Sequence, residues 1–83
     1  MNKEILAKIK WQARRGMLEL DLILSRFLEN AGDRLSDAQW QAISLLLNEQ
    51  DPDLYTWLMG YQTPEEEGLK NSVALIQAIY SAK

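Results

Sequence analysis

The sequence contains no cysteine and no histidine among its 83 residues. The absence of cysteine excludes a disulfide framework, a cysteine-ligated zinc site and a thiol nucleophile. The absence of histidine excludes a Ser-His-Asp triad, the usual haem ligand and an imidazole acid–base catalyst. Carboxylates could still hold an oxygen-ligated metal, but no segment has the spacing of a calcium-binding EF-hand loop. We therefore expect neither a catalytic site nor a metal site.

The sequence also lacks a long apolar run, since no 18 consecutive residues are apolar. This excludes a membrane-spanning helix. The first residues show neither the apolar segment and small-residue cleavage site of a secretory signal nor the composition of an Arg- and Ser-rich transit peptide. We therefore expect the protein to work in the compartment where it is made. The length allows one domain, residues 1–83, and an apolar share of 47% is typical of a folded one.

Helical periodicity divides the N-terminal half into two expected helices. The first covers residues 2–15, with Arg14 and Arg15 in its last turn, where cations suit the helix dipole. Gly16 would then be the left-handed residue beyond the helix end. The second covers 17–30 and is apolar around most of its circumference, which predicts a central position. The alternative is one continuous helix through Gly16, at a cost of about 1 kcal/mol.

Capping residues predict three further helices. One begins at Ser36, which forms a capping box with Gln39. The next has Asp51 at the cap and Pro52 in the first helical position, and Gly60 closes it. The last opens at residues 63–66. No stretch alternates as a β-strand would. The sequence therefore predicts an all-α domain, a small five-helix bundle. The expected inward positions include Leu20, Leu24, Phe27, Trp40, Ile43, Leu46, Leu54, Trp57, Leu58, Leu69, Val73, Ile76, Ile79 and Tyr80.

Charge is distributed unevenly along the chain. Residues 1–15 hold five cations and one anion, a net of 5 − 1 = +4, whereas residues 16–83 hold four cations and eleven anions, a net of 4 − 11 = −7. The plainest interpretation is a solvated basic helix face. A nucleic-acid partner is not expected, because the pI is near 4.8. The helix that could mimic a recognition helix carries Asp51 and Asp53 and no Lys or Arg.

The run of residues 14–21 places two arginines, a glycine and two carboxylates within eight residues. Helix-end effects account for each of them separately. A compact Arg and Glu pair at a rigid joint also forms a good recognition site, since Arg offers a fixed fork of donors that carboxylates accept. Both interpretations remain open on the residues alone.

The same run carries the signature R-G-x-x-E as Arg15, Gly16 and Glu19. It is joined about 35 residues later by D-P-D-L-Y-x-W-L, at residues 51–58. In these two motifs the chain resembles the FAD assembly factors of succinate dehydrogenase (the SdhE/YgfY family). The likeness extends from Trp11 to Phe27, resumes at residues 35–37, and covers nearly the whole chain.

The resemblance implies a five-helix, chaperone-like protein that is not an enzyme. Members of the family bind the flavoprotein subunit of succinate dehydrogenase, and in bacteria that of fumarate reductase, and promote covalent attachment of FAD to a histidine of that client. By position, Arg15, Gly16 and Glu19 carry over as the client-binding motif. This chain has no histidine of its own, so the nucleophile must belong to the client. It also has no Gly-rich phosphate loop, and we expect no tightly bound FAD. The implied location is the bacterial cytoplasm.

Other side chains extend the expected client surface beyond the motif. The additional candidates are Trp11, Arg14, Asp21, Asp53 and Tyr55. Trp11 could instead pack on the second helix. The hypothesis requires the corner formed by Arg15, Gly16 and Glu19 to be accessible to another polypeptide.

Two other classes of function could account for parts of the sequence pattern. One is a small adaptor or antitoxin-like regulatory protein that binds an unrelated partner. The other is an enzyme acting through Glu19 and Asp21, which is disfavoured because residues two apart on a helix point about 200° apart. We expect a monomer, because a factor that must leave its client gains nothing from a large permanent interface.

Overall fold

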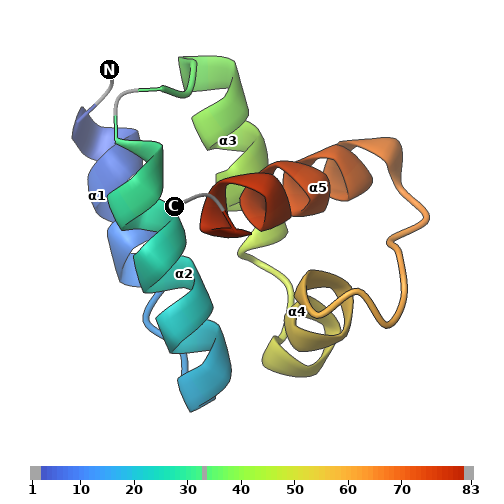
Figure 1. Ribbon diagram of the computed structural model, residues 1–83. Helices are drawn as coiled ribbons and strands as arrows, with labels where there is room; N and C mark the ends of the chain where they lie inside the picture. The colour runs from blue at the N-terminus through green and yellow to red at the C-terminus, as the bar shows by residue number, and fades with distance from the viewer. Residues whose placement is uncertain (1–2, 33, 82–83) are drawn as a thin grey trace.

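The computed structural model describes residues 3–32 and 34–81. They form five helices: α1 (Lys3–Gln12), α2 (Leu18–Ala31), α3 (Asp37–Leu46), α4 (Asp51–Leu58) and α5 (Glu67–Ser81) (Figure 1). No strand occurs in these two ranges, so the predicted all-α fold is confirmed. None of the helices described is long and apolar enough to cross a bilayer.

The helix at the centre of the bundle is α5. It packs against α2, α3 and α4, while α1 packs against α3 (Figure 1). The expectation that the second helix is central is therefore wrong. Leu18 and Leu22 are 66% and 61% exposed, so two of the leucines that made α2 look buried all round face solvent.

The core lies where the inward faces of all five helices meet. Trp40 and Phe27 are its largest members, with ring centroids 5.9 Å apart in a tilted arrangement. Most of the expected inward positions are buried, whereas Trp57, Leu69 and Tyr80 are only partly buried. The fully enclosed large side chains are Ile9, Leu20, Leu24, Phe27, Trp40, Ile43, Leu46, Leu54 and Ile76.

The joint between the first two helices differs from the prediction. Helix α1 ends at Gln12, so Arg14 and Arg15 lie beyond its last turn, and the expected start at Asn2 falls outside the described residues. The two helices are separate, joined by the α1–α2 linker (residues 13–17). Gly16 is not left-handed, because among the described glycines only Gly32 and Gly60 have positive φ.

The remaining boundaries match the capping signals to within a few residues. The capping box of Ser36 and Gln39 is present as predicted. Helix α4 starts one residue earlier than expected, with Gln50 at the cap and no side-chain cap bond. Gly60 follows it with φ 82°. Helix α5 begins only at Glu67, after the expected opening segment 63–66.

Helix α2 continues through Ala31 to Gly32, whose φ of 51° ends it. The turn expected at residues 30–33 is therefore shorter than predicted. Asp33, its last member, lies outside the described residues.

Candidate functional site

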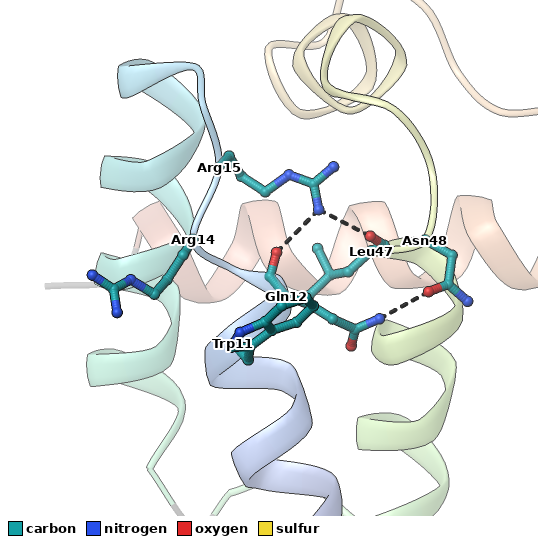
Figure 2. Close-up of a pocket in the computed structure, with 6 residues that line it drawn as sticks. All are labelled: Trp11, Gln12, Arg14, Arg15, Leu47 and Asn48. Atoms are coloured by element: carbon teal, nitrogen blue, oxygen red, sulfur yellow. Dashed lines mark hydrogen bonds between the residues drawn. The ribbon is translucent and has the colours of Figure 1, made fainter.

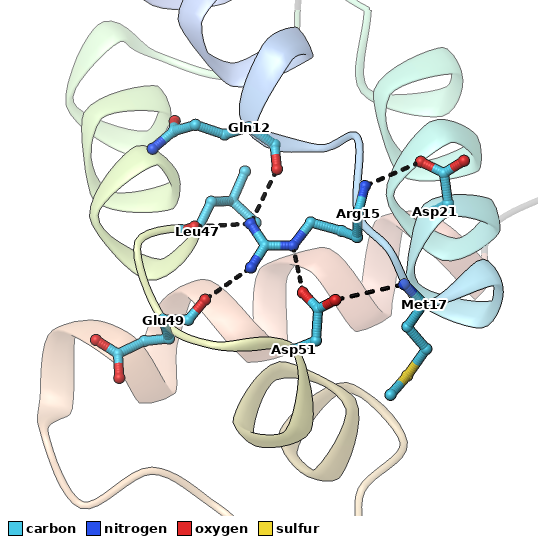
Figure 3. Close-up of polar contacts among 7 residues, drawn as sticks. All are labelled: Gln12, Arg15, Met17, Asp21, Leu47, Glu49 and Asp51. Carbon is cyan, nitrogen blue, oxygen red and sulfur yellow. Dashed lines mark hydrogen bonds and ion pairs between the residues drawn. The ribbon is translucent and has the colours of Figure 1, made fainter.

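Arg15 is the most extensively bonded side chain of the R-G-x-x-E motif. It lies in the α1–α2 linker, and its side chain is only 15% exposed. Its Nη1 donates to the carbonyl oxygens of Gln12 and Leu47, both at 3.0 Å, and its Nη2 donates to that of Glu49 at 2.8 Å (Figure 3). Its Nε donates to Asp51 Oδ1 at 2.6 Å. Four of the five guanidinium N–H groups are therefore used inside the chain.

Asp51, the first residue of α4, binds the α1–α2 linker at two points. One carboxylate oxygen accepts from Arg15, and Oδ2 accepts from the backbone N–H of Met17 at 3.4 Å (Figure 3). Asp51 is the first residue of α4 and Gln50 is its N-cap, so the Asp51 carboxylate binds the neighbouring linker and does not cap its own helix. The α1–α2 linker is thereby fixed against the α3–α4 linker (residues 47–50).

Two further contacts hold the linker from other sides. Asp21 of α2 accepts from the backbone N–H of Arg15 at 3.3 Å. Gln12, the last residue of α1, is 8% exposed, and its amide donates to the Ser44 carbonyl at 3.2 Å and to Asn48 Oδ1 at 2.9 Å. Ser44 Oγ returns a bond to Gln12 Oε1 at 2.9 Å. The end of α1 is thus locked to α3 by buried polar contacts that satisfy one another.

The motif is divided between the interior and the surface. Arg15 is turned inward, whereas Gly16 and Glu19 are exposed. Around them, Arg14 is exposed and its guanidinium points away from that of Arg15 (Figure 2). The corner is therefore accessible through its glycine and its glutamate.

The other predicted site residues lie at different depths. Trp11 is 75% exposed, so it does not pack on α2. Asp53 is exposed, Tyr55 is half-buried, and Asp21 is half-buried with its carboxylate bound to the linker. Asp21 thus contributes to holding the corner in place.

A surface hollow of about 520 Å³ opens beside the motif. Trp11 and Arg14 form one part of its lining, and Leu47 and Asn48 form another (Figure 2). Gln12 and Arg15 complete it. No group of three or more Asp, Glu, His or Cys residues that could hold a metal occurs in the part of the chain that the structure describes.

Sequence reasoning did not single out Tyr61, which is 67% exposed. The turn at Gly60 brings its ring against Tyr55, with centroids 6.1 Å apart and the ring planes at 64°. Tyr61 raises the pKa of Tyr55 above its ordinary value of 10.0, with smaller contributions from desolvation and from the charge of Glu19. The glycine before Tyr61 was the only sequence signal for this pair, and it predicts a turn without saying which ring it meets.

The fold and the corner define a small all-α protein whose α1–α2 linker is held by hydrogen bonds and exposes Gly16. Residues 7–80 match a family model described as flavinator of succinate dehydrogenase. Two curated relatives are named FAD assembly factor SdhE. The one from Legionella pneumophila (strain Lens) is 50% identical over 64 residues, which cover 77% of this chain and 81% of that protein. The one from Coxiella burnetii is 42% identical over 82 residues, covering 98% and 100%.

A comparison with solved structures gives a match that is consistent with these relatives. The solution structure of a UPF0350 protein aligns with a TM-score of 0.73 and 41% identity over 94% of this chain and 83% of that one. The chain belongs to the flavinator of succinate dehydrogenase family. The resemblance seen in the sequence is confirmed.

Proposed function

We propose that this protein binds the flavoprotein subunit of succinate dehydrogenase and promotes covalent attachment of FAD to a histidine of that subunit. Family membership supports the proposal, as do the names of the relatives. The nucleophile comes from the client, because this chain has no histidine or cysteine. In this proposal FAD is bound by the client, and the assembly factor is not an enzyme.

The observation that carries the proposal is the exposure of Gly16 and Glu19 on a corner that Arg15 holds rigid. A rigid surface can bind one client conformer more tightly than others and so shift the population toward it. If that conformer brings the flavin and the histidine to reaction distance, attachment accelerates without any group of this chain taking part in the chemistry.

The three motif residues have different roles in this proposal. Glu19 makes a charge-assisted contact with the client, and Gly16 lets the client backbone approach closely. Arg15 is a positioning residue, since four of its N–H groups are already bonded within the chain. This changes the sequence-based hypothesis, in which Arg15 and Glu19 both contact the client directly.

The proposal extends to a wider surface and to a second client. Arg14 and Trp11 on one side, and Asp53 and Tyr55 on the other, complete the contact area. In bacteria the flavoprotein subunit of fumarate reductase is a further client. The protein acts as a monomer in the cytoplasm.

The proposal is tested by expressing the flavoprotein subunit with and without this protein and measuring covalent flavin fluorescence in a denaturing gel. The wild-type chain should raise the signal, and Glu19→Ala and Gly16→Arg should lower it. A Cβ at Gly16 would meet only Asp51 Oδ2, at 3.9 Å, so a larger side chain can point outward without disturbing the fold.

Glu29→Ala is the matched control, because Glu29 is an exposed glutamate on the same helix and outside the motif. The control should retain flavinylation, and all variants should keep their helical circular dichroism. If Glu19→Ala and Gly16→Arg flavinylate as well as the control does, the motif is not the client-binding site. If the flavoprotein is absent from a pull-down with the wild-type chain, an adaptor for another partner is favoured.

A further inference from the structure

A second exposed surface adjoins the corner on the side of α4. Asp51, Tyr55 and Met59 recur every four residues and therefore lie on one face of this helix and its C-terminal end. Asp51 binds the α1–α2 linker, so this face borders the start of α2. Glu19 lies in the first turn of α2, and its charge acts on the hydroxyl of Tyr55. The aromatic patch is defined here as Tyr55, Met59 and Tyr61, with Glu19 at its edge.

The aromatic patch is open to a visiting side chain. Tyr61 is 67% exposed and Met59 is 43% exposed. The edge-to-face arrangement of the two tyrosines leaves ring surface of Tyr61 in solvent. Among the described residues, no side-chain hydrogen bond or ion pair involves the carboxylate of Glu19, so this carboxylate is available to a partner.

The charge near the aromatic patch indicates the charge of the partner that it would bind. Residues 35–69 contain no lysine and no arginine, yet they contain seven acidic residues. Asp51 among them is neutralised by Arg15. The remaining acids lack a basic residue in this whole stretch, so the segment that contains α4 has a net negative charge, and Asp53 on α4 is exposed. Such a surface attracts cations and repels acidic segments.

An aromatic ring and a free carboxylate next to each other recognise one kind of side chain well. A guanidinium stacks on the ring face within about 6 Å and places its donor fork on the carboxylate. The chain itself contains a contact of the first kind, since the Arg26 guanidinium lies 5.9 Å from the centroid of the Tyr80 ring. Arginine suits this geometry better than lysine, because its planar fork can stack and donate at the same time.

We propose that Tyr61 and Tyr55, together with Glu19, form a subsite that binds an arginine side chain of the flavoprotein client. This rests on the proposed function, because it names the client chemistry that Glu19 meets. It adds Tyr61, which the motif does not include, as a specificity-determining residue. It also proposes that the acidic segment that contains α4 favours a basic client surface.

The test measures binding of the purified flavoprotein subunit to the full chain by titration calorimetry at low and high salt. Tyr61→Leu should weaken binding about tenfold, which corresponds to about 1.4 kcal/mol, because it removes the ring and retains apolar bulk. Tyr61→Phe should recover most of that loss, since it restores the ring. Glu19→Gln should weaken binding and flatten its salt dependence.

The control is Leu45→Ala. Leu45 is also a large exposed side chain, 64% exposed, but it lies on α3 beside Ile5 and Lys8. This variant should bind the client as the wild-type chain does. Each variant is first checked for an unchanged helical spectrum and unfolding midpoint.

The occupant is identified by scanning arginines on the client surface to alanine. One client variant should lose affinity to a similar extent, and combining it with Tyr61→Leu should cost little more, because both remove the same contact. The inference is overturned if Tyr61→Leu binds within twofold of wild type, if Tyr61→Phe is as weak as Tyr61→Leu, or if no client arginine couples to Tyr61. The proposed function fails separately, if the wild-type chain neither binds nor flavinylates the client.

Discussion

At the scale of single residues, the guanidinium of Arg15 contributes most to the shape of the corner. It replaces water for three backbone carbonyl groups and one carboxylate, which come from the end of α1, the α3–α4 linker and the start of α4. Hydrogen bonds that involve a charged group contribute about 1.5–3 kcal/mol each to stability, and unpaired partners left behind add a penalty. The conformation of the α1–α2 linker therefore depends on this one side chain.

Replacing Arg15 should destabilise the fold, whereas replacing Arg14 should not. We expect Arg15→Ala to lower the free energy of unfolding by about 2–4 kcal/mol, and Arg15→Lys to recover only part of it, because an ammonium cannot reach acceptors on both linkers. Arg14→Ala is the matched control and should change stability by less than about 0.5 kcal/mol, since its side chain is exposed. Urea unfolding followed by circular dichroism measures all three. Equal effects at the two arginines would contradict the positioning role.

The raised pKa of Tyr55 gives a second residue-scale prediction. Because Tyr61 is its largest cause, Tyr61→Phe should bring the pKa of Tyr55 down toward 10.0, as measured by NMR titration of labelled tyrosine rings. In the wild-type chain the folded state keeps this proton at pH values where the unfolded state has lost it. The free energy of unfolding should therefore fall as the pH rises above 10, and fall less in the variant. A pKa of Tyr55 that Tyr61→Phe leaves unchanged would contradict the contact.

At the scale of elements, the two linkers act as one unit. Helices α1 and α3 are bonded through Gln12 and Ser44, and the start of α4 is bonded to the start of α2 through Asp51. The exposed Glu19 sits on the first turn of α2, so its orientation relative to α4 is set by these contacts. The ends of these helices are therefore held by hydrogen bonds to other elements.

A comparison of the two aspartates in the first turn of α4 distinguishes the effect of the ion pair with Arg15 from the effect of the helix dipole. Both favour the helix dipole, but only Asp51 binds Arg15, while Asp53 is exposed. Asp51→Asn should therefore lower the free energy of unfolding by about 1–3 kcal/mol more than Asp53→Asn does. Chemical denaturation of both variants and of the wild type measures the difference. If the two variants are equally stable, the ion pair does not hold the joint.

At the scale of the whole molecule, α5 organises the core. It contacts three of the other four helices, and its residues Ile76 and Val73 are buried among them. A chain of 83 residues is expected to have a total stability of about 4–12 kcal/mol. The free-energy cost of one large cavity in this core is therefore a substantial fraction of the total stability.

Shortening a buried side chain at the centre of α5 should show how strongly the stability of the protein depends on this helix. Ile76→Ala should cost about 2–5 kcal/mol and lower the melting temperature by more than about 10 °C, because Ile76 is fully buried. Leu45→Ala, which shortens a side chain that is 64% exposed, is the control and should shift the melting temperature by only a few degrees. Thermal unfolding measures both. A similar effect at the two positions would mean that α5 is not central to the core.

Several features could be predicted from the sequence because they depend on local chemistry. The capping box of Ser36, the turn at Gly60 and the periodic burial of Trp40 and Ile43 each follow from residues within one or two turns of each other. The number of helices and the family follow from the same short-range patterns and from the R-G-x-x-E and D-P-D-L-Y-x-W-L motifs. All of these features depend on residues that are close together in the sequence, so they can be predicted without knowing which helices pack together.

Other features were decided only when the helices packed together. Nothing near Arg15 in the sequence indicates that it bonds to carbonyls more than 30 residues away, or that the Asp51 carboxylate binds the α1–α2 linker while Gln50 occupies the cap position of α4. Likewise, the apolar residues of α2 lie around most of its circumference, and the sequence does not indicate which of its faces the other helices cover. Leu22 lies on a face that stays exposed. Local sequence determines which surfaces and caps are available, and the long-range geometry determines which of them are used, because a buried charge and an apolar face can each be satisfied only by partners that the fold brings near.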